Sequence, residues 1–269
     1  MKKIIFCTYF DKNYLPKGLA LHASLLRDYK DAKLWILCMD NYTYDILNGL
    51  SLEGVKLIKL RELENRNREL LSIKKTRTLV EYYWTCTPYL PLYILDNLKN
   101  CEMVVYLDAD IYFYSSINKI IEEFGDKSIY LVEHRYPKNQ IERCETSGRF
   151  NVGLLIWRND KEGKDCLLRW KKQCFDWCYF REENSKMGDQ MYLNQWPGIY
   201  KKTVISKNLG VNAAPWNINQ YKITVKKEGI FLNEDCLICY HFHQFDFLKT
   251  DKYYFPYGYR ISGIIKRYI

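Results

Sequence analysis

The chain has 269 residues, of which 48% are hydrophobic and 16% aromatic, and its formal net charge is +9. This composition excludes a disordered or low-complexity chain and predicts one large domain or two small ones. The mild basic excess fits anionic partners such as nucleotides, phospholipid surfaces or nucleic acid, without choosing among them.

Strand-like and helical patterns alternate in the first half of the chain. Apolar runs typical of buried strands cover residues 3–8, 34–39, 55–60 and 103–107, and helical patterns cover 15–29, 78–85 and 90–98. Short, continuous aliphatic runs are typical of strands that are buried on both faces. The alternation predicts an α/β fold with a mostly parallel sheet flanked by helices on both faces.

The second half is less regular. Strands are expected at residues 129–133, 151–157, 223–225, 230–232 and 237–242, and a helix at 161–179. No internal repeat or linker is visible, so we expect a single compact domain with two lobes. No stretch of 18 apolar residues exists, and the opening apolar run is shorter than a signal segment. Ten cysteines without a signal segment indicate free, buried thiols in a reducing compartment, so the cytoplasm is the expected location.

Two carboxylates, Asp108 and Asp110, directly follow the apolar run at 103–107. Side chains at positions i and i+2 off a strand end lie on the same side. In an open α/β sheet, ligands bind beyond the carboxyl ends of the strands. The pair therefore makes half of a site for a hard cation that would hold a diphosphate. The alternative is a solvated turn after a strand.

Near the end of the chain, Cys239, His241 and His243 alternate along a predicted strand and are expected on one face. Imidazole beside two carboxylates favours Mn²⁺ over Mg²⁺. Two alternatives remain: a pair of hydrogen-bonded core histidines, or a zinc site that uses Cys236 and Cys239. No second cysteine pair at zinc spacing follows them.

Two further segments have ordinary structural explanations when each is taken alone. Asn151 and Gly153 open a predicted strand, where they could be a turn cap and a bulge. Asp189 and Gln190 begin a predicted helix, where Asp189 could be the N-cap.

Taken together and in order, five elements resemble a known pattern. They are Asp11-Lys12-Asn13-Tyr14 after the first strand, Tyr106-Leu107-Asp108-Ala109-Asp110, Phe150-Asn151-Val152-Gly153, Asp189-Gln190, and a late histidine. The series resembles the GT-A nucleotide-sugar transferases. It is most similar to glycosyltransferase family 8, the group of glycogenin and the bacterial lipopolysaccharide galactosyltransferases. The resemblance spans about residues 3–250.

The resemblance implies a Rossmann-like GT-A fold with a nucleotide-binding lobe at about 1–115, a sugar and acceptor lobe at about 116–250, and a basic aromatic tail at 251–269. It implies transfer of a sugar from a nucleoside diphosphate, expected to be UDP, to a glycan or lipid-linked acceptor with retention of anomeric configuration. It implies no nucleic-acid partner.

The resemblance also implies roles for individual residues. Asp108, Asp110 and the late histidine, either His241 or His243, would hold Mn²⁺ or Mg²⁺. Asn151, Gly153 and Asp189 would lie at the donor sugar, with Gln190 beside the anomeric carbon. The implied base and ribose site is the loop that contains Thr8, Tyr9, Asp11, Asn13 and Tyr14.

The chain departs from the family pattern at the positions of two basic side chains. The family has a Lys six residues after its histidine, a spacing that Lys249 meets relative to His243 only. It also has an Arg in the helix before the carboxylate pair, for which Arg77 or Lys74 could substitute. The lining of the acceptor site is not apparent, and residues 133–135 are one candidate.

Two other function classes remain open at this point. An aspartate-based phosphatase also places two aspartates after a buried strand, but it expects Thr or Val where Tyr112 stands. A non-catalytic nucleotide-sugar or glycan-binding module could share the fold. Residues 249–269 combine a net charge of +4 with several aromatic side chains. That tail predicts either peripheral contact with an anionic membrane or packing across the domain.

Overall fold

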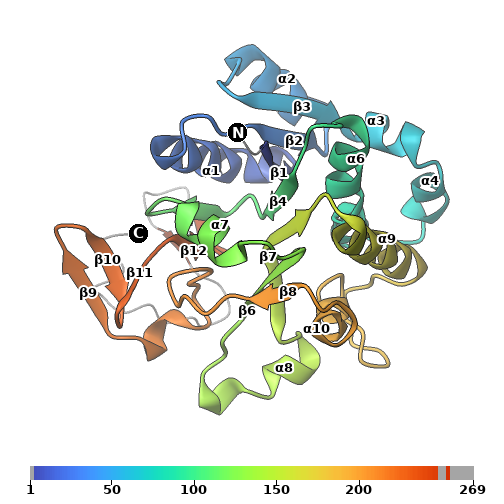
Figure 1. The fold of residues 1–269 in the computed structure, drawn as a ribbon. Helices are drawn as coiled ribbons and strands as arrows, with labels where there is room; N and C mark the ends of the chain where they lie inside the picture. Colours follow the sequence, from blue (N-terminus) through green and yellow to red (C-terminus); the bar gives the residue numbers. More distant parts are fainter. Residues whose placement is uncertain (1–2, 248–252, 255–269) are drawn as a thin grey trace.

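The computed structural model describes residues 3–247 and 253–254. Its centre is a seven-stranded sheet in the order β3-β2-β1-β4-β7-β6-β8 (Figure 1). The strands are β1 (Ile4–Phe10), β2 (Leu34–Cys38), β3 (Val55–Lys59), β4 (Met103–Leu107), β6 (Ile129–Glu133), β7 (Phe150–Arg158) and β8 (Thr203–Ile205). All neighbouring pairs are parallel except those of β7 with β4 and with β6. The predicted mostly parallel sheet is confirmed.

Helices cover both faces of this sheet, as predicted. The longer ones are α1 (Leu15–Asp28), α2 (Asn41–Leu50), α5 (Leu79–Cys86), α6 (Tyr89–Asn97) and α9 (Lys161–Asp176). The shorter ones are α3 (Leu60–Arg66), α4 (Glu69–Lys74), α7 (Asn118–Phe124), α8 (Arg143–Thr146) and α10 (Trp196–Ile199). Side-chain caps mark several starts: Asp40 accepts from the backbone of Thr43 at α2, and Asp160 from that of Gly163 at α9.

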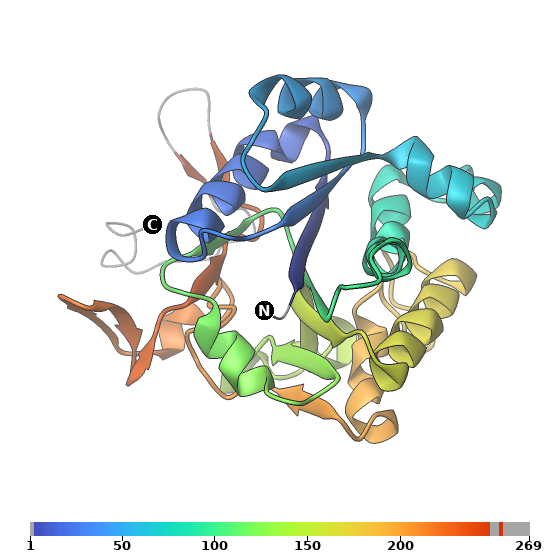
Figure 2. The ribbon, with the colours of Figure 1, turned by 45° about the horizontal axis from the view of Figure 1, so that its top comes forward.

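The hydrophobic core has two halves because successive strand residues point to opposite faces. On one face, Ile5 of β1 and Val104 of β4 pack with residues of α5, α6 and α9. On the other face, Phe6 and Val105 pack with residues of α1 and α7. Figures 1 and 2 show α1 and the α6–α9 pair on opposite sides of the central strands.

The last part of the described chain adds small sheets beside the main one. Strand β5 (Ile111–Phe113) pairs with β12 (Cys239–His241), and β13 (Asp246–Phe247) pairs with β14 (Tyr253–Tyr254). Strands β9 (Ile223–Lys226), β10 (Gly229–Leu232) and β11 (Asp235–Cys236) form an antiparallel sheet that projects at one side (Figure 1). A turn joins β9 to β10, and Gly229 adopts a φ of 141° there.

The sequence patterns missed α2, α3, α4 and α7 because these helices bury few apolar side chains. In α2 only Thr43 and Leu47 are buried, too few to produce a periodic signal. Helix α9 ends at Asp176 rather than at the predicted residue 179, since Trp177 is extended with a φ of −157° and a ψ of 121°. The predicted final strand is shortened to Cys239–His241.

The expectation for the cysteines is confirmed. All ten are free, and every one except the half-buried Cys144 is buried. None of the helices in the described part of the chain combines the length and apolar character needed to cross a bilayer. The basic aromatic tail lies outside the described residues, apart from the two that form β14.

A cluster of three tryptophans joins the sheet to α9 and α10. The rings of Trp157 in β7, Trp170 in α9 and Trp196 in α10 have centroids 5.4 to 6.1 Å apart. Trp170 also donates from Nε1 to the backbone oxygen of Asp189 at 2.8 Å. The cluster therefore ties residue 189 to the core.

We expect Trp170→Ala to lower the free energy of unfolding by about 3–5 kcal/mol, because the fully buried ring leaves a cavity. Leu168→Ala, two residues earlier on the same helix and 54% exposed, should change it by less than about 0.5 kcal/mol. Urea denaturation followed by circular dichroism measures both. Equal losses in the two variants would contradict the central role of the cluster.

Candidate active site

The strand order of the main sheet places two loops side by side. The sequence order of the strands reverses between β1 and β4, which are parallel neighbours. Their carboxyl ends therefore lie side by side at a switch in strand order, the kind of position where open α/β sheets bind ligands. The chain leaves β1 at Phe10 and continues into Asp11, and it leaves β4 at Leu107 and continues into Asp108.

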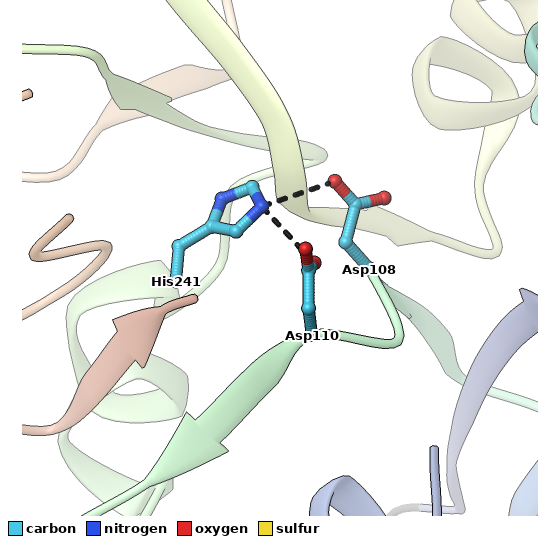
Figure 3. A group of neighbouring side chains, drawn as sticks. All are labelled: Asp108, Asp110 and His241. Carbon is cyan, nitrogen blue, oxygen red and sulfur yellow. Dashed lines mark ion pairs between the residues drawn. The ribbon is translucent and has the colours of Figure 1, made fainter. Parts of the chain in front are cut away.

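Asp108, Asp110 and His241 converge at the end of β4 (Figure 3). The Nε2 atom of His241 lies 3.1 Å from Oδ1 of Asp110 and 3.6 Å from Oδ2 of Asp108. One ligand atom from each residue falls within 4.8 Å of the others. In the part of the chain that the structure describes, this is the only cluster of three His, Cys, Asp or Glu residues able to hold a metal.

The pairing of β5 with β12 brings the histidine to the carboxylates. His241 lies opposite Ile111, and the backbone N–H of Phe242 donates to the carbonyl of Asp110 at 2.8 Å. On the other side, the N–H of Asp108 donates to the carbonyl of Gly153 in β7 at 2.9 Å. The cluster is thus fixed to β7 and β12 through the backbone.

The strand ends at His241, so the expected shared face of His241 and His243 is wrong. The chain turns after Phe242, whose carbonyl accepts from the N–H of Phe245 at 2.9 Å. The ring of His243 packs edge-on against Trp216 at 5.3 Å and against His241 at 5.7 Å. It is not one of the three clustered ligands.

Gly153 allows His241 to approach β7 closely. A Cβ at this position would lie 2.6 Å from Oδ1 of Asn151 and 2.7 Å from Nδ1 of His241. Both distances are too short for a carbon atom, so the position requires glycine. As predicted, Asn151 and Gly153 lie at the start of a strand, β7.

The charges of the cluster depend on one another. Burial alone would lower the pKa of His241, but the carboxylates of Asp110 and Asp108 raise it above its ordinary value. Burial would raise the pKa of Asp110, but His241 outweighs burial and lowers it. Burial raises the pKa of Asp108, and Asp110 adds to the shift. The buried carboxylate of Asp110 and the half-buried one of Asp108, beside one histidine, leave a negative charge for a cation to neutralise.

Asp189 and Gln190 precede a 3₁₀ helix, η3 (Met191–Gln195), and Gln190 rather than Asp189 is its N-cap residue. Burial raises the pKa of Asp189 to about 7, and the charge of Asp108 contributes. Asp189 is therefore close enough to the cluster for the two carboxylates to interact. The amide nitrogen of Gln190 donates to the carbonyl of Ser147 at 2.7 Å, which turns its Oε1 away from Ser147.

The loop after β1 is anchored by Asp11. Its carboxylate accepts from the backbone N–H of Asn13 at 2.9 Å and from the hydroxyl of Tyr83 in α5 at 3.3 Å. The hydroxyl of Tyr9 lies 3.1 Å from Oγ1 of Thr87. The five predicted residues differ in burial: Thr8 and Asp11 are buried, Tyr9 is half-buried, and Asn13 and Tyr14 are exposed.

The predicted cations lie in different places. Arg77 is buried, and its guanidinium donates to the carbonyls of Cys174 and Phe175 at the end of α9, both at 2.6 Å. Lys74 pairs with Glu64 at 2.6 Å. The position of Lys249 falls outside the described residues. A different lysine, Lys17 in α1, is one of the charges that act on Asp110, His241 and His243.

The residue composition of the cluster fits a divalent cation. Two carboxylates and one imidazole are a donor set that suits Mn²⁺ and also admits Mg²⁺. The alternative zinc pair, Cys236 and Cys239, belongs to no group of three possible metal ligands among the described residues.

Several site residues were not found from the sequence. Tyr106 donates from its hydroxyl to Oδ1 of Asp108 at 2.7 Å, and its spacing two residues earlier on the same strand was a usable signal. Asn212 lies 3.3 Å from Nδ1 of His241 and Trp216 packs on its ring, yet no local pattern marks either residue. The candidate acceptor residue His134 is instead buried beneath Asn151.

Comparisons with known proteins agree with this geometry. The sequence model described as Glycosyl transferase family 8 matches residues 4–203. Two proteins of Bacillus subtilis (strain 168) are similar, both with "uncharacterized protein" in their names. YfnD is 30% identical over 264 residues, which cover 97% of this chain and 84% of YfnD. YfnF is 33% identical over 244 residues, which cover 88% of this chain and 80% of YfnF.

Solved structures share the fold at low sequence identity. Mouse xyloside xylosyltransferase 1 in its apo form is 15% identical, with a TM-score of 0.57, over 90% of this chain and 98% of that one. The galactosyltransferase LgtC, in complex with donor and acceptor sugar analogs, is 14% identical, with a TM-score of 0.58, over 88% and 86%. The main sheet and its flanking helices are thus the GT-A architecture. The chain belongs to glycosyltransferase family 8 and is a glycosyltransferase.

Proposed function

We propose that the protein transfers a sugar from a nucleoside diphosphate donor to a glycan or lipid-linked acceptor, in a reaction that depends on a divalent metal. The observation that carries this proposal is the cluster of Asp108, Asp110 and His241 at the carboxyl end of β4, beside the loop that follows β1. The aspartate-based phosphatase is set aside because the chain belongs to a glycosyltransferase family.

Mn²⁺ is the proposed metal, with Mg²⁺ as the alternative, and the three clustered residues would hold it. A divalent cation there neutralises the charge that develops on a leaving diphosphate. His241 is the proposed imidazole ligand, because its Nε2 atom faces both carboxylates. The positive charge of Lys17, which acts on the same cluster, would help to stabilise the diphosphate. Lys249 stays a candidate for that role.

UDP is the proposed nucleotide, and the loop after β1 would bind its base and ribose. Thr8, Tyr9, Asp11, Asn13 and Tyr14 are the candidate contacts. Asp11 is held by Asn13 and Tyr83, which gives this loop a fixed shape before any ligand enters. Because both terminal nitrogens of the buried Arg77 guanidinium donate to carbonyls at the end of α9, we assign it to positioning that helix rather than to the donor.

We propose retention of the anomeric configuration, with Gln190 beside the anomeric carbon and Asp189 at the sugar hydroxyls. Cleavage of the C1–O bond passes through an oxocarbenium-like state. The carbonyl of Gln190 could steady the positive charge, and the acceptor hydroxyl would attack from the same face while the departing phosphate takes its proton. The tethers of Gln190 to Ser147 and of Asp189 to Trp170 support a fixed geometry for this segment.

We propose that the protein acts at the inner face of a membrane, on the basis of the composition of residues 249–269. Their basic and aromatic side chains suit an anionic bilayer that displays a lipid-linked acceptor. A cytoplasmic site of action remains the proposal that goes with free thiols.

We expect Asp110→Asn to reduce release of UDP from UDP-sugars at least ~100-fold, because the metal loses a charged ligand and the leaving group loses its stabilisation. A luminescent UDP assay with a panel of UDP-sugars and Mn²⁺ measures the rate. Asp126→Asn, an exposed carboxylate on the loop after α7, is the matched control and should leave it unchanged. Undiminished activity of the wild type in excess EDTA would rule out metal dependence.

Gly153→Ala should weaken Mn²⁺ binding by roughly 10- to 100-fold, since the added methyl group displaces His241 or its partner Asn151. The control is Gly49→Ala in α2, where a Cβ would have no atom within 4 Å. Electron paramagnetic resonance of free Mn²⁺ gives the affinity. Wild-type affinity in the Gly153 variant would show that the close approach of His241 is not needed.

The stereochemistry of the product tests the role given to Gln190. Proton NMR of the fresh product from an α-linked donor should show an α-linkage, and Gln190→Ala should slow the reaction without changing the configuration. A β-linked product would mean an inverting enzyme, for which a general base would have to be sought.

A further inference from the structure

The face of His241 that points away from the carboxylates is enclosed by two asparagines. Its Nδ1 atom lies 3.2 Å from Oδ1 of Asn151 and 3.3 Å from Oδ1 of Asn212. All three side chains are buried. Two amide groups therefore contact a single nitrogen of the ring.

The backbone N–H of Gly153, which can only donate, fixes the direction of these hydrogen bonds. The backbone N–H of Gly153 donates to Oδ1 of Asn151 at 3.0 Å, so this end of the amide is the oxygen. Since that oxygen also faces Nδ1 of His241, the proton lies on Nδ1. The nitrogen of the same amide then donates to Nε2 of His134 at 3.3 Å. His134 can accept because burial lowers its pKa to about 3 and keeps it neutral.

The backbone of Asn212 is held in place without the ring of His241. Its φ of 59° lies in the left-handed region, its N–H donates to the thiol of Cys239 at 3.3 Å, and its carbonyl accepts from Asn217 at 3.2 Å. The next residue, Ala213, is hydrogen-bonded to β12 through both its N–H and its carbonyl. Its carbonyl accepts from the N–H of His241 at 2.7 Å, and its N–H donates to Cys239 at 3.2 Å.

The ring of His241 is also restrained from the side. Trp216 packs edge-on against it at 5.2 Å, and the indole is held by a hydrogen bond from Nε1 to the carbonyl of His134 at 2.9 Å. One acceptor at Nδ1 would leave the imidazole able to pivot about that bond. A second acceptor on a separate, anchored segment removes this freedom.

We propose that Asn212 is a positioning residue for His241. Together with Asn151 it keeps a proton on Nδ1 and fixes the ring so that Nε2 faces Asp108 and Asp110. The tautomer of a histidine that binds a metal is set by the hydrogen bond of its other nitrogen, and such partners strongly affect metal affinity. The inference rests on the proposed metal dependence for its consequence, but not for its geometry.

Two substitutions at position 212 distinguish the contribution of the side-chain oxygen from that of the backbone conformation. Asn212→Gly removes the oxygen and keeps a residue that tolerates the positive φ. Asn212→Asp keeps an oxygen acceptor opposite Nδ1. The matched control is Asn184→Gly, an exposed asparagine with a φ of 51°. Thermal unfolding of all three proteins checks that they remain folded.

Binding of Mn²⁺ alone, measured by electron paramagnetic resonance, is the first measurement. We expect Asn212→Gly to bind Mn²⁺ roughly 10- to 100-fold more weakly than the wild type. Asn212→Asp and Asn184→Gly should bind it with an affinity close to that of the wild type. A folded Asn212→Gly protein with wild-type affinity would overturn the proposal. An Asn212→Asp protein as weak as Asn212→Gly would also overturn it, because the acceptor oxygen would then not matter.

A second measurement on the metal-free protein keeps the test independent of the proposed function. Solvent exchange of the His241 Nδ1 proton, followed by NMR with ring-labelled histidine, should be at least ~10-fold faster in Asn212→Gly than in the wild type, because one of its two acceptors is lost. Equal exchange would reject the role of Asn212. A wild type that does not bind Mn²⁺ would instead contradict the proposed metal, and the exchange rates would still decide the role of Asn212.

Discussion

Strand β12 pairs with β5, and this short ladder joins two parts of the chain that are far apart in sequence. Through it, His241 comes to lie next to the turn that carries Asp108 and Asp110. Each part is incomplete by itself: the carboxylates would be a solvated turn, and the histidine would be a buried polar side chain. The bond from the N–H of Phe242 to the carbonyl of Asp110 is therefore the contact on which the site depends.

Asp110 and His241 are buried, and buried charges are costly unless they are paired. His241 offsets part of the charge of the two carboxylates, and Tyr106 donates to Asp108. Behind the histidine, the amides of Asn151 and Asn212 satisfy its second nitrogen. This arrangement pairs the groups on the inner side of the site and leaves net negative charge on its carboxylates.

The sequence supported much of the fold because its strands are buried on both faces. The run Met103–Leu107 is wholly buried, and α1 and α9 bury one clear stripe each. The sheet, the carboxylates at the end of β4, and the start of β7 at Phe150 were predictable for this reason. Helices such as α2, which bury only two residues, left no comparable pattern.

The sequence could not show contacts that depend on distant segments. Strand alternation placed His243 beside His241, but the turn after Phe242 breaks the alternation, and only the folded chain shows this. Arg77 was a reasonable candidate for the donor, but its charge is taken up by carbonyls nearly a hundred residues later. Asn212 and Trp216 have no local signature, because their roles arise from packing against β12.

The central claim is that Asp108, Asp110 and His241 form one metal site. A crystal structure of the protein grown with Mn²⁺ and UDP, with anomalous diffraction collected at the manganese edge, tests it most directly. The account predicts one strong anomalous peak at bonding distance from both carboxylates and from Nε2 of His241. A peak bound through His243 with His241 remote, or a peak far from β4, would contradict it.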